Sequence, residues 1–232
     1  TNEDYVEHNY GLKKEEIDFM RVSDGYGYQC EAGTREAYDE MIDYASNNYE
    51  SEDFYDELNT MMDIDEYVDY QIIEQYVGNT DWVSNNTKLW RKHDGGRFRW
   101  ILFDTDFGLS KATSVDKDMI KFATSEKGNA PMWALLKSCL KNEDFRWKFL
   151  DQYLDRLENQ FTDERIDTKL DSIWNLTRLD MCATIKNSGF LGAPGNQDEF
   201  DKIVEEMRNF AKVRKGYVVD QLKKELGLGD DS

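Results

Sequence analysis

Residues 78–108 read GNTDWVSNNTKLWRKHDGGRFRWILFDTDFG, and this stretch predicts the centre of the fold. It opens as a polar loop, alternates apolar and polar residues around the turn-forming HDGG at 93–96, and ends on two aspartates. Asp-Gly and Gly-Gly pairs are typical of hairpin turns, and alternation is typical of strands. We therefore predict a β-hairpin with strands near 87–92 and 97–103.

The segments on either side of the hairpin are predicted to be helical. Residues 63–77 carry apolar side chains at helical spacing, and Gly78 follows as a natural helix end. The same spacing predicts helices at 13–22, 34–47, 51–61, 131–141, after the caps Asn142 and Thr162, and at 199–226. Residues 110–127 and 187–197 are predicted to be irregular. The fold class is therefore mainly α (α+β): one domain over residues 1–232 with a small β-hairpin inserted near 87–103.

Composition limits the classes of partner. Hydrophobic residues make up 39% of the 232-residue chain, which is enough for a packed core. The formal net charge is −19, so the phosphates of nucleic acid would be repelled, and no nucleic-acid partner is expected. No long apolar run occurs, so no membrane insertion is expected. The oligomeric state is left open.

Four oxygen-bearing side chains stand at the two ends of the predicted hairpin. Asp81 and Asn86 are five positions apart in the preceding loop, and Asp104 and Asp106 follow the second strand. Mg²⁺ prefers hard oxygen ligands, and phosphoryl transfer also needs a carboxylate that meets the acceptor hydroxyl. Protein kinases present the same order of parts: an aspartate, an asparagine five residues later, a hairpin, then a metal-binding aspartate.

Each piece alone has a simpler explanation. Asp81 could cap the segment that follows it, and Asn85 or Asn86 could satisfy the backbone of a turn. The letters DFG at 106–108 could be chance. Asp104 is harder to dismiss, because a carboxylate at the end of a buried strand needs a partner.

Two other enzyme classes use paired aspartates. A haloacid-dehalogenase-type phosphatase places its aspartate nucleophile on the first strand of a parallel sheet, whereas here about a hundred mostly helical residues come first. A glycosyltransferase metal site needs a nucleotide-binding α/β sheet, and no alternation of strands and helices predicts one. A non-catalytic surface or scaffold module with a kinase-like fold remains open.

The stretch YQIIEQYVGNTDWVSNNTKLWR…RFRWILFDTDFGLS, residues 70–110, resembles the CotH kinases, named for spore-coat protein H. Residues 142–162 and 210–228 resemble the C-terminal helices of that family, and residues 4–22 resemble the segment after its nucleotide-clamping lobe. The resemblance implies an atypical protein-kinase-like fold, of which this chain would form the helical C-lobe.

The resemblance also implies roles for single residues. Asp81 corresponds to the catalytic aspartate, and Asn86 to the metal-binding asparagine, with Asn85 as the alternative. Asp104 corresponds to the principal metal ligand at the nucleotide, and Asp106 to a second ligand or an outer-shell residue. The implied cofactors are ATP with Mg²⁺ or Mn²⁺.

The resemblance finally implies a setting for the reaction. The acceptor would be a Ser or Thr hydroxyl of a protein, and the location would be extracellular, on the cell surface or in a spore coat. Neither a glycine-rich phosphate loop nor a strand lysine precedes Asp81. We therefore expect a fragment that lacks most of the nucleotide-clamping lobe and is inactive alone, although its parent would be a kinase.

Overall fold

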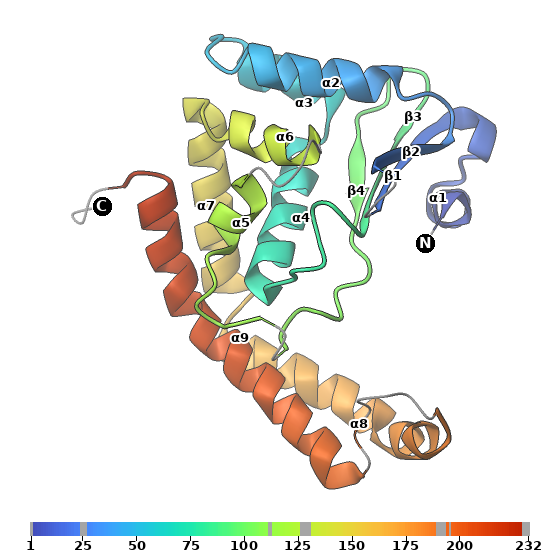
Figure 1. Cartoon of the computed structure of the whole chain (residues 1–232), viewed down its shortest axis with the longest axis vertical. Coiled ribbons are helices and arrows are strands. Elements are labelled where there is room, and N and C mark those ends of the chain that lie inside the picture. Colours follow the sequence, from blue (N-terminus) through green and yellow to red (C-terminus); the bar gives the residue numbers. More distant parts are fainter. Residues whose placement is uncertain are drawn as a thin grey trace.

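The computed structural model describes residues 2–23, 27–110, 113–125, 131–188, 194 and 196–228. Within them the chain forms nine α-helices, one short 3-10 helix and a four-stranded antiparallel sheet, which confirms the mainly helical α+β prediction (Figure 1). The helical elements are α1 (Glu3–Tyr10), η1 (Lys14–Glu16), α2 (Glu36–Asn47), α3 (Phe54–Met61), α4 (Ile64–Val77), α5 (Met119–Thr124), α6 (Pro131–Cys139), α7 (Glu143–Asn159), α8 (Asp163–Ser188) and α9 (Gln197–Glu225). The strands are β1 (Ile17–Ser23), β2 (Gly27–Ala32), β3 (Thr87–Lys92) and β4 (Arg99–Ile101).

The predicted hairpin is confirmed as β3 and β4, but it forms only half of the sheet. The strand order is β2-β1-β3-β4, and every neighbouring pair is antiparallel. The helix predicted over 13–22 is wrong, because β1 occupies most of that range. The architecture is therefore a helical body with a sheet on one side rather than a helical body with a single inserted hairpin.

Burial of both faces explains why β1 resembles a helix in the sequence. Phe19 and Met20 lie on opposite faces of the sheet and are both fully buried, and the register shift against β2 places its extra residue, Glu31, on β2. Ile17 and Phe19 pack on one face of the sheet, whereas Met20 and Val22 pack on the other. The two-residue period of the strand is kept, but apolar residues on both faces hide the alternation of apolar and polar residues that would mark a strand in the sequence. Pairing with β3, about seventy residues later, decides the structure.

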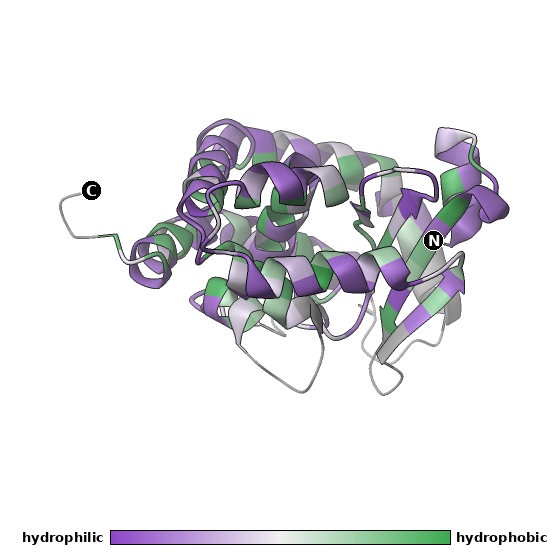
Figure 2. Cartoon of the chain, turned by 90° about the horizontal axis from the view of Figure 1, so that it is seen from above, coloured by the Kyte–Doolittle hydropathy of each residue, from purple (hydrophilic) through white to green (hydrophobic). Residues whose placement is uncertain are grey.

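Hydrophobic clusters lie on both faces of the sheet. The smaller cluster joins Val6 of α1 to Ile17, Phe19, Trp90 and Ile101. The larger one joins the opposite face to helices α2 to α7 and α9. Figure 2 shows the matching pattern, with hydrophobic and hydrophilic residues alternating along strands and forming stripes along helices. The sheet is thereby held between α1 and the helical body.

Helix α4 runs through the centre of the body and ends at the candidate site. Asp63 caps its start by accepting from the Glu66 amide over 3.3 Å. Gly78 ends it with φ at 71°, a left-handed conformation that glycine adopts without a Cβ clash. Because α4 is buried on most sides, its last turn holds the following loop against the core.

The two segments predicted to be irregular also need correction, and the second of them lies partly outside the described residues. The range 110–127, predicted irregular, contains α5. The range 187–197 begins inside α8, while residues 189–193 and 195 lie outside the described part of the chain. The helices after Asn142 and Thr162 are confirmed as α7 and α8. In the described part, no helix has the length and apolar character needed to cross a bilayer.

Candidate active site

The loop that follows α4 is organised by the side chain of Asn79, which is fully buried. Its amide nitrogen donates to Glu74 Oε2 over 2.9 Å and to the Asp104 carbonyl oxygen over 3.5 Å. Its amide oxygen accepts from the Asp81 backbone N–H over 3.1 Å. One side chain therefore joins the last turn of α4, the loop and the segment after β4.

Asp81 is half-buried and its carboxylate is held on both oxygens. Asn85 Nδ2 donates to Oδ1 and Asn86 Nδ2 donates to Oδ2, each over 3.0 Å. The spacing seen in the sequence thus becomes a carboxylate oriented by two amides. Each carboxylate oxygen retains a further lone pair that can accept a proton or a hydrogen bond.

The inner face of α4 supports the loop through Tyr70 and Glu74, which are one helical turn apart. Trp82 Nε1 donates to the Tyr70 hydroxyl over 2.8 Å, so the middle of the loop is anchored in the core. Glu74 is fully buried, and Asn79 is the partner of its Oε2. Burial raises the pKa of Glu74 to about 8, although the Asn79 bond lowers it. At neutral pH this buried side chain is therefore chiefly a neutral acid.

The two aspartates after β4 lie outside the core. The strand ends at Ile101, two residues earlier than predicted, and the side chains of Asp104 and Asp106 are exposed. The expectation that Asp104 is a buried carboxylate in need of a partner is therefore wrong. What is buried behind it is Asn79, which bonds the Asp104 carbonyl oxygen. Phe107 is also exposed, at 44%.

A cation lies near Asp104. The side chain of Lys88 on β3 places its ammonium 4.6 Å from the centre of the Phe103 ring. Burial lowers the pKa of Lys88, whereas nearby acids, Asp104 among them, raise it. The ammonium thus contributes positive charge on the hairpin side of the two aspartates.

The segment 104–109 is fastened to the end of α4. The Leu109 amide donates to the Val77 carbonyl oxygen over 2.6 Å. A Cβ placed on Gly108 would lie 2.7 Å from Val77 Cγ2, closer than such atoms approach. Only glycine lets this turn pack so tightly against α4. The last turn of α4 therefore holds both the loop with Asp81 and the segment with Asp104.

Unusual backbone conformations concentrate at this site. In the described residues the non-glycine positions with positive φ are Val83, Asn86, Asp104 and Leu109, with φ values of 71°, 49°, 56° and 51°. Such conformations cost free energy and persist where surrounding structure enforces them, which is common at functional sites. Two of the four, Asn86 and Asp104, are candidate ligands from the sequence.

The chemistry of these donors fits a divalent cation that keeps part of its water shell. Among the described residues no cluster of three or more His, Cys, Asp or Glu side chains has the arrangement of a metal site. The proposed set instead combines the exposed carboxylates of Asp104 and Asp106 with the amide oxygen of Asn86. Mg²⁺ commonly takes one or two carboxylates and completes its shell with water and substrate phosphates. A set of this size suits Mg²⁺ bound together with ATP.

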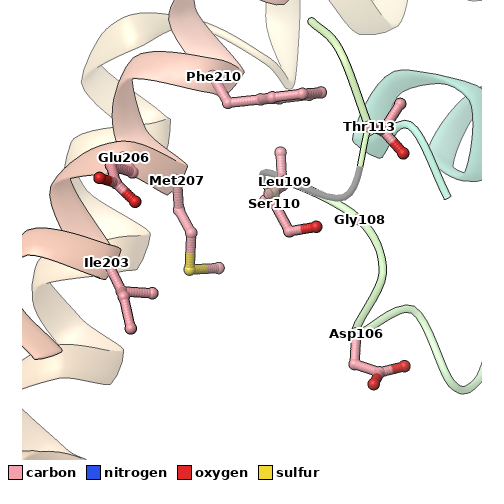
Figure 3. Close-up of a pocket in the computed structure, with 9 residues that line it drawn as sticks. All are labelled: Asp106, Gly108, Leu109, Ser110, Thr113, Ile203, Glu206, Met207 and Phe210. Carbon is pink, nitrogen blue, oxygen red and sulfur yellow. The ribbon is translucent and has the colours of Figure 1, made fainter. Parts of the chain in front are cut away.

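A pocket of about 490 Å³ opens beside Asp106. Figure 3 shows its two walls: Ile203, Glu206, Met207 and Phe210 of α9 on one side, and Asp106, Gly108, Leu109, Ser110 and Thr113 on the other. Thr113 Oγ1 lies 3.3 Å from the Thr80 hydroxyl, next to Asp81. The pocket therefore adjoins both aspartate-bearing segments and has a mainly apolar lining.

The sequence missed two residues of this arrangement. Asn79 was counted only as part of a polar loop, and Glu74 as part of a helix. A glutamate on the buried face of the 63–77 helix was the available signal, since a buried acid needs a hydrogen-bonding partner. The structure brings Asp81, Asn85 and Asn86 into direct contact, and it joins the backbones of Asp81 and Asp104 through Asn79.

Comparison with known proteins adds one match. A family model described as "CotH kinase protein" matches residues 5–218, which is most of the chain. No curated protein matches. The matched range includes the whole site built above, together with the sheet and most of α9.

Proposed function

The chain belongs to the CotH kinase family, and from this premise we propose that its full-length form transfers the γ-phosphoryl group of ATP to a serine or threonine hydroxyl of a protein. Family membership implies kinase-type phosphotransfer. The acceptor and the roles of single residues are our proposal. The observation that carries it is the carboxylate of Asp81, oriented by two amides and joined through Asn79 to the segment that bears Asp104.

Asp81 is the proposed general base. In the reaction a new P–O bond forms to the acceptor oxygen, the bond between the γ-phosphorus and ADP breaks, and the hydroxyl proton passes to a carboxylate oxygen. Asn85 and Asn86 hold Asp81 in one orientation, which favours attack because a fixed geometry removes the entropy of alignment.

Asp104 and Asn86 would hold the metal–nucleotide complex, with Asp106 as a further ligand or a hydrogen-bonding neighbour. When bound, Mg²⁺ or Mn²⁺ would neutralise charge on the phosphates. The exposure of Asp104 suits this role, since an exposed carboxylate can meet a nucleotide that arrives from solvent. Lys88 contributes positive charge on the same side.

The pocket beside Asp106 would receive residues that flank the acceptor hydroxyl. It lies against Thr113, whose hydroxyl contacts Thr80, the residue before Asp81. Its lining is mainly apolar, which would favour burial of an apolar side chain of the substrate. We further propose an extracellular, cell-surface or spore-coat setting, which rests on the family resemblance alone.

A non-catalytic scaffold is the second candidate. The sequence before Asp81 contains neither a glycine-rich phosphate loop nor a recognisable strand lysine, and these groups clamp ATP in kinases. A kinase-like module without them would keep the fold and lose the reaction. The two candidates differ in whether ATP binds in the presence of a divalent ion.

The test measures transfer of labelled γ-phosphate from ATP to a library of serine- and threonine-containing peptides, with Mg²⁺ or Mn²⁺. It uses the 232-residue chain and its natural full-length form, with Asp81→Asn and the control Asp94→Asn in the exposed hairpin turn. We expect Asp81→Asn to lose about 100-fold or more of the rate, as for other general bases, and Asp94→Asn to match the wild type. Absence of metal-dependent ATP binding by both forms would establish the scaffold instead.

A further inference from the structure

The hydrogen bonds of Asn79 leave its amide a single orientation. The Asp104 carbonyl oxygen can only accept, so the amide nitrogen must face it, and Glu74 Oε2 accepts from the same nitrogen. The Asp81 backbone N–H can only donate, so the amide oxygen must face it. Rotation of the amide by 180° would set donor against donor and acceptor against acceptor.

The backbone atoms that Asn79 contacts belong to the two aspartates of the proposed reaction. Asp81 carries the general base, and Asp104 carries the principal metal ligand. Their positions in the chain differ by 23 residues, yet each bonds the same buried amide. Asp104 also has a left-handed φ of 56°, which local propensity does not favour. The Asn79 bond is a tertiary contact that supports this conformation.

A buried glutamate such as Glu74 costs desolvation free energy, so its presence in the core indicates a specific role. It is fully buried, and in the described residues its Oε1 has no hydrogen-bond partner. An apolar side chain at this position would avoid the cost of desolvating a carboxyl group. Its Oε2, however, accepts from the Asn79 nitrogen over 2.9 Å and thereby holds the amide in the orientation that the two backbone groups set.

We propose that Asn79 and Glu74 form a positioning pair for phosphoryl transfer, in which the Asn79 amide sets the spacing between the backbones of Asp81 and Asp104, and Glu74 holds that amide. The inference rests on the proposed function for its catalytic consequence. Neither residue touches the reacting atoms, so both act through the two aspartates. Supporting hydrogen bonds of this kind are worth about 10–100-fold in activity or metal affinity in metalloenzymes.

The experiment compares Asn79→Ala, Glu74→Leu, Glu74→Gln and the double variant Asn79→Ala/Glu74→Leu. Asn142→Ala is the matched control, because Asn142 is also a buried asparagine that joins two segments, donating to the Tyr49 carbonyl and accepting from the Phe145 amide far from the site. Each variant is made in the full-length form and assayed below its melting temperature for kcat, KM for ATP and the Mn²⁺ concentration at half-maximal rate.

We expect kcat to fall by about 10–100-fold in Asn79→Ala and about 10-fold in Glu74→Leu, with a higher Mn²⁺ requirement in both. Glu74→Gln keeps an acceptor for Asn79 and retains most of the activity. The double variant is no slower than Asn79→Ala, because Glu74 acts through Asn79 and the two losses do not add. Asn142→Ala loses stability and leaves kcat unchanged.

A second readout does not depend on activity. Amide hydrogen exchange at Asp81, followed by NMR, reports directly on the bond to Asn79 Oδ1. We expect faster exchange in Asn79→Ala and Glu74→Leu, and no change in Glu74→Gln or Asn142→Ala. If Asn79→Ala keeps the kcat of Asn142→Ala, the positioning role is overturned and the proposed function stands. If the wild type transfers no phosphate, the proposed function is wrong, and the catalytic part of the inference is wrong with it. If the Asp81 amide exchanges at the wild-type rate in Asn79→Ala and Glu74→Leu, the structural part of the inference is wrong as well.

Discussion

The Arg214 guanidinium donates to the backbone carbonyl oxygen of Gln75 over 3.0 Å, across 139 positions of the chain. Arg214 lies on α9 and is fully buried, and its other terminal nitrogen donates to the carbonyl oxygens of Val115 and Lys117 over 2.7 Å. The contact thus ties α9 to the last turn of α4 and to the segment after the pocket. The helix end that carries the candidate site depends on a residue near the end of the chain.

Arg214→Met should destabilise the fold by about 3 kcal/mol, because the carbonyl oxygens of Gln75 and Val115 lose the Arg214 donor and the Lys117 oxygen keeps only its bond from Gln221. The measurement is urea unfolding followed by circular dichroism. Lys215→Met on the next position of α9 is the control, and its unfolding free energy should stay within about 0.5 kcal/mol of the wild type. Equal stability of the two variants would show that the guanidinium bonds do not hold α9 in place.

Asp104→Ala should abolish transfer while the protein stays folded. The side chain is exposed, but alanine is strained at the left-handed φ of Asp104, so the melting temperature should fall by no more than about 5 °C. The rate should fall by ~100-fold or more, because a ligand of a charge-neutralising metal is worth several kcal/mol. Asp106→Ala should cost about 10-fold, as expected of a secondary ligand or outer-shell residue. A larger loss in Asp106→Ala than in Asp104→Ala would reverse the two assignments.

Glu74 should make stability fall as the pH rises. Burial raises its pKa in the folded protein from 4.5 to about 8. Between these values the unfolded chain releases a proton that the folded protein keeps, so unfolding becomes more favourable with rising pH. The slope should reach at most about 1.4 kcal/mol per pH unit. Below pH 4.5 and above pH 8 this contribution is flat.

The measurement for Glu74 is the unfolding free energy of the wild type and of Glu74→Gln from pH 4 to pH 9. The amide does not titrate, so the difference between the two proteins isolates Glu74. The wild type should lose stability relative to Glu74→Gln across the window, and a difference independent of pH would contradict a buried neutral acid at this position.

Local signals in the sequence predicted several elements well. The helical spacing of residues 63–77, the helix end at Gly78 and the Asp-Gly-Gly turn each act within a few residues, so α4 and the hairpin could be identified before any tertiary contact was known. The spacing of Asp81 and Asn86 likewise indicated a shared loop, and the two side chains are in contact.

Elements that depend on distant partners could not be identified in this way. The strand β1 is decided by pairing with β3, and its burial on both faces removes the alternation that marks a half-buried strand. Asn79 and Glu74 matter because they are buried. The sequence does not show this, because a polar residue in a loop or helix is usually exposed to solvent.

The sequence by itself determined the kind of chain: a mainly helical protein with a hairpin, and a set of carboxylate and amide groups at its two ends. Only the tertiary structure decided how these groups are held, with Asp81 and Asp104 exposed to different degrees and their backbones joined by one buried amide. The physical reason is the separation in sequence over which each kind of interaction acts. Helix caps and turns act between neighbours in sequence, whereas a hydrogen bond across the core forms only after the chain has packed.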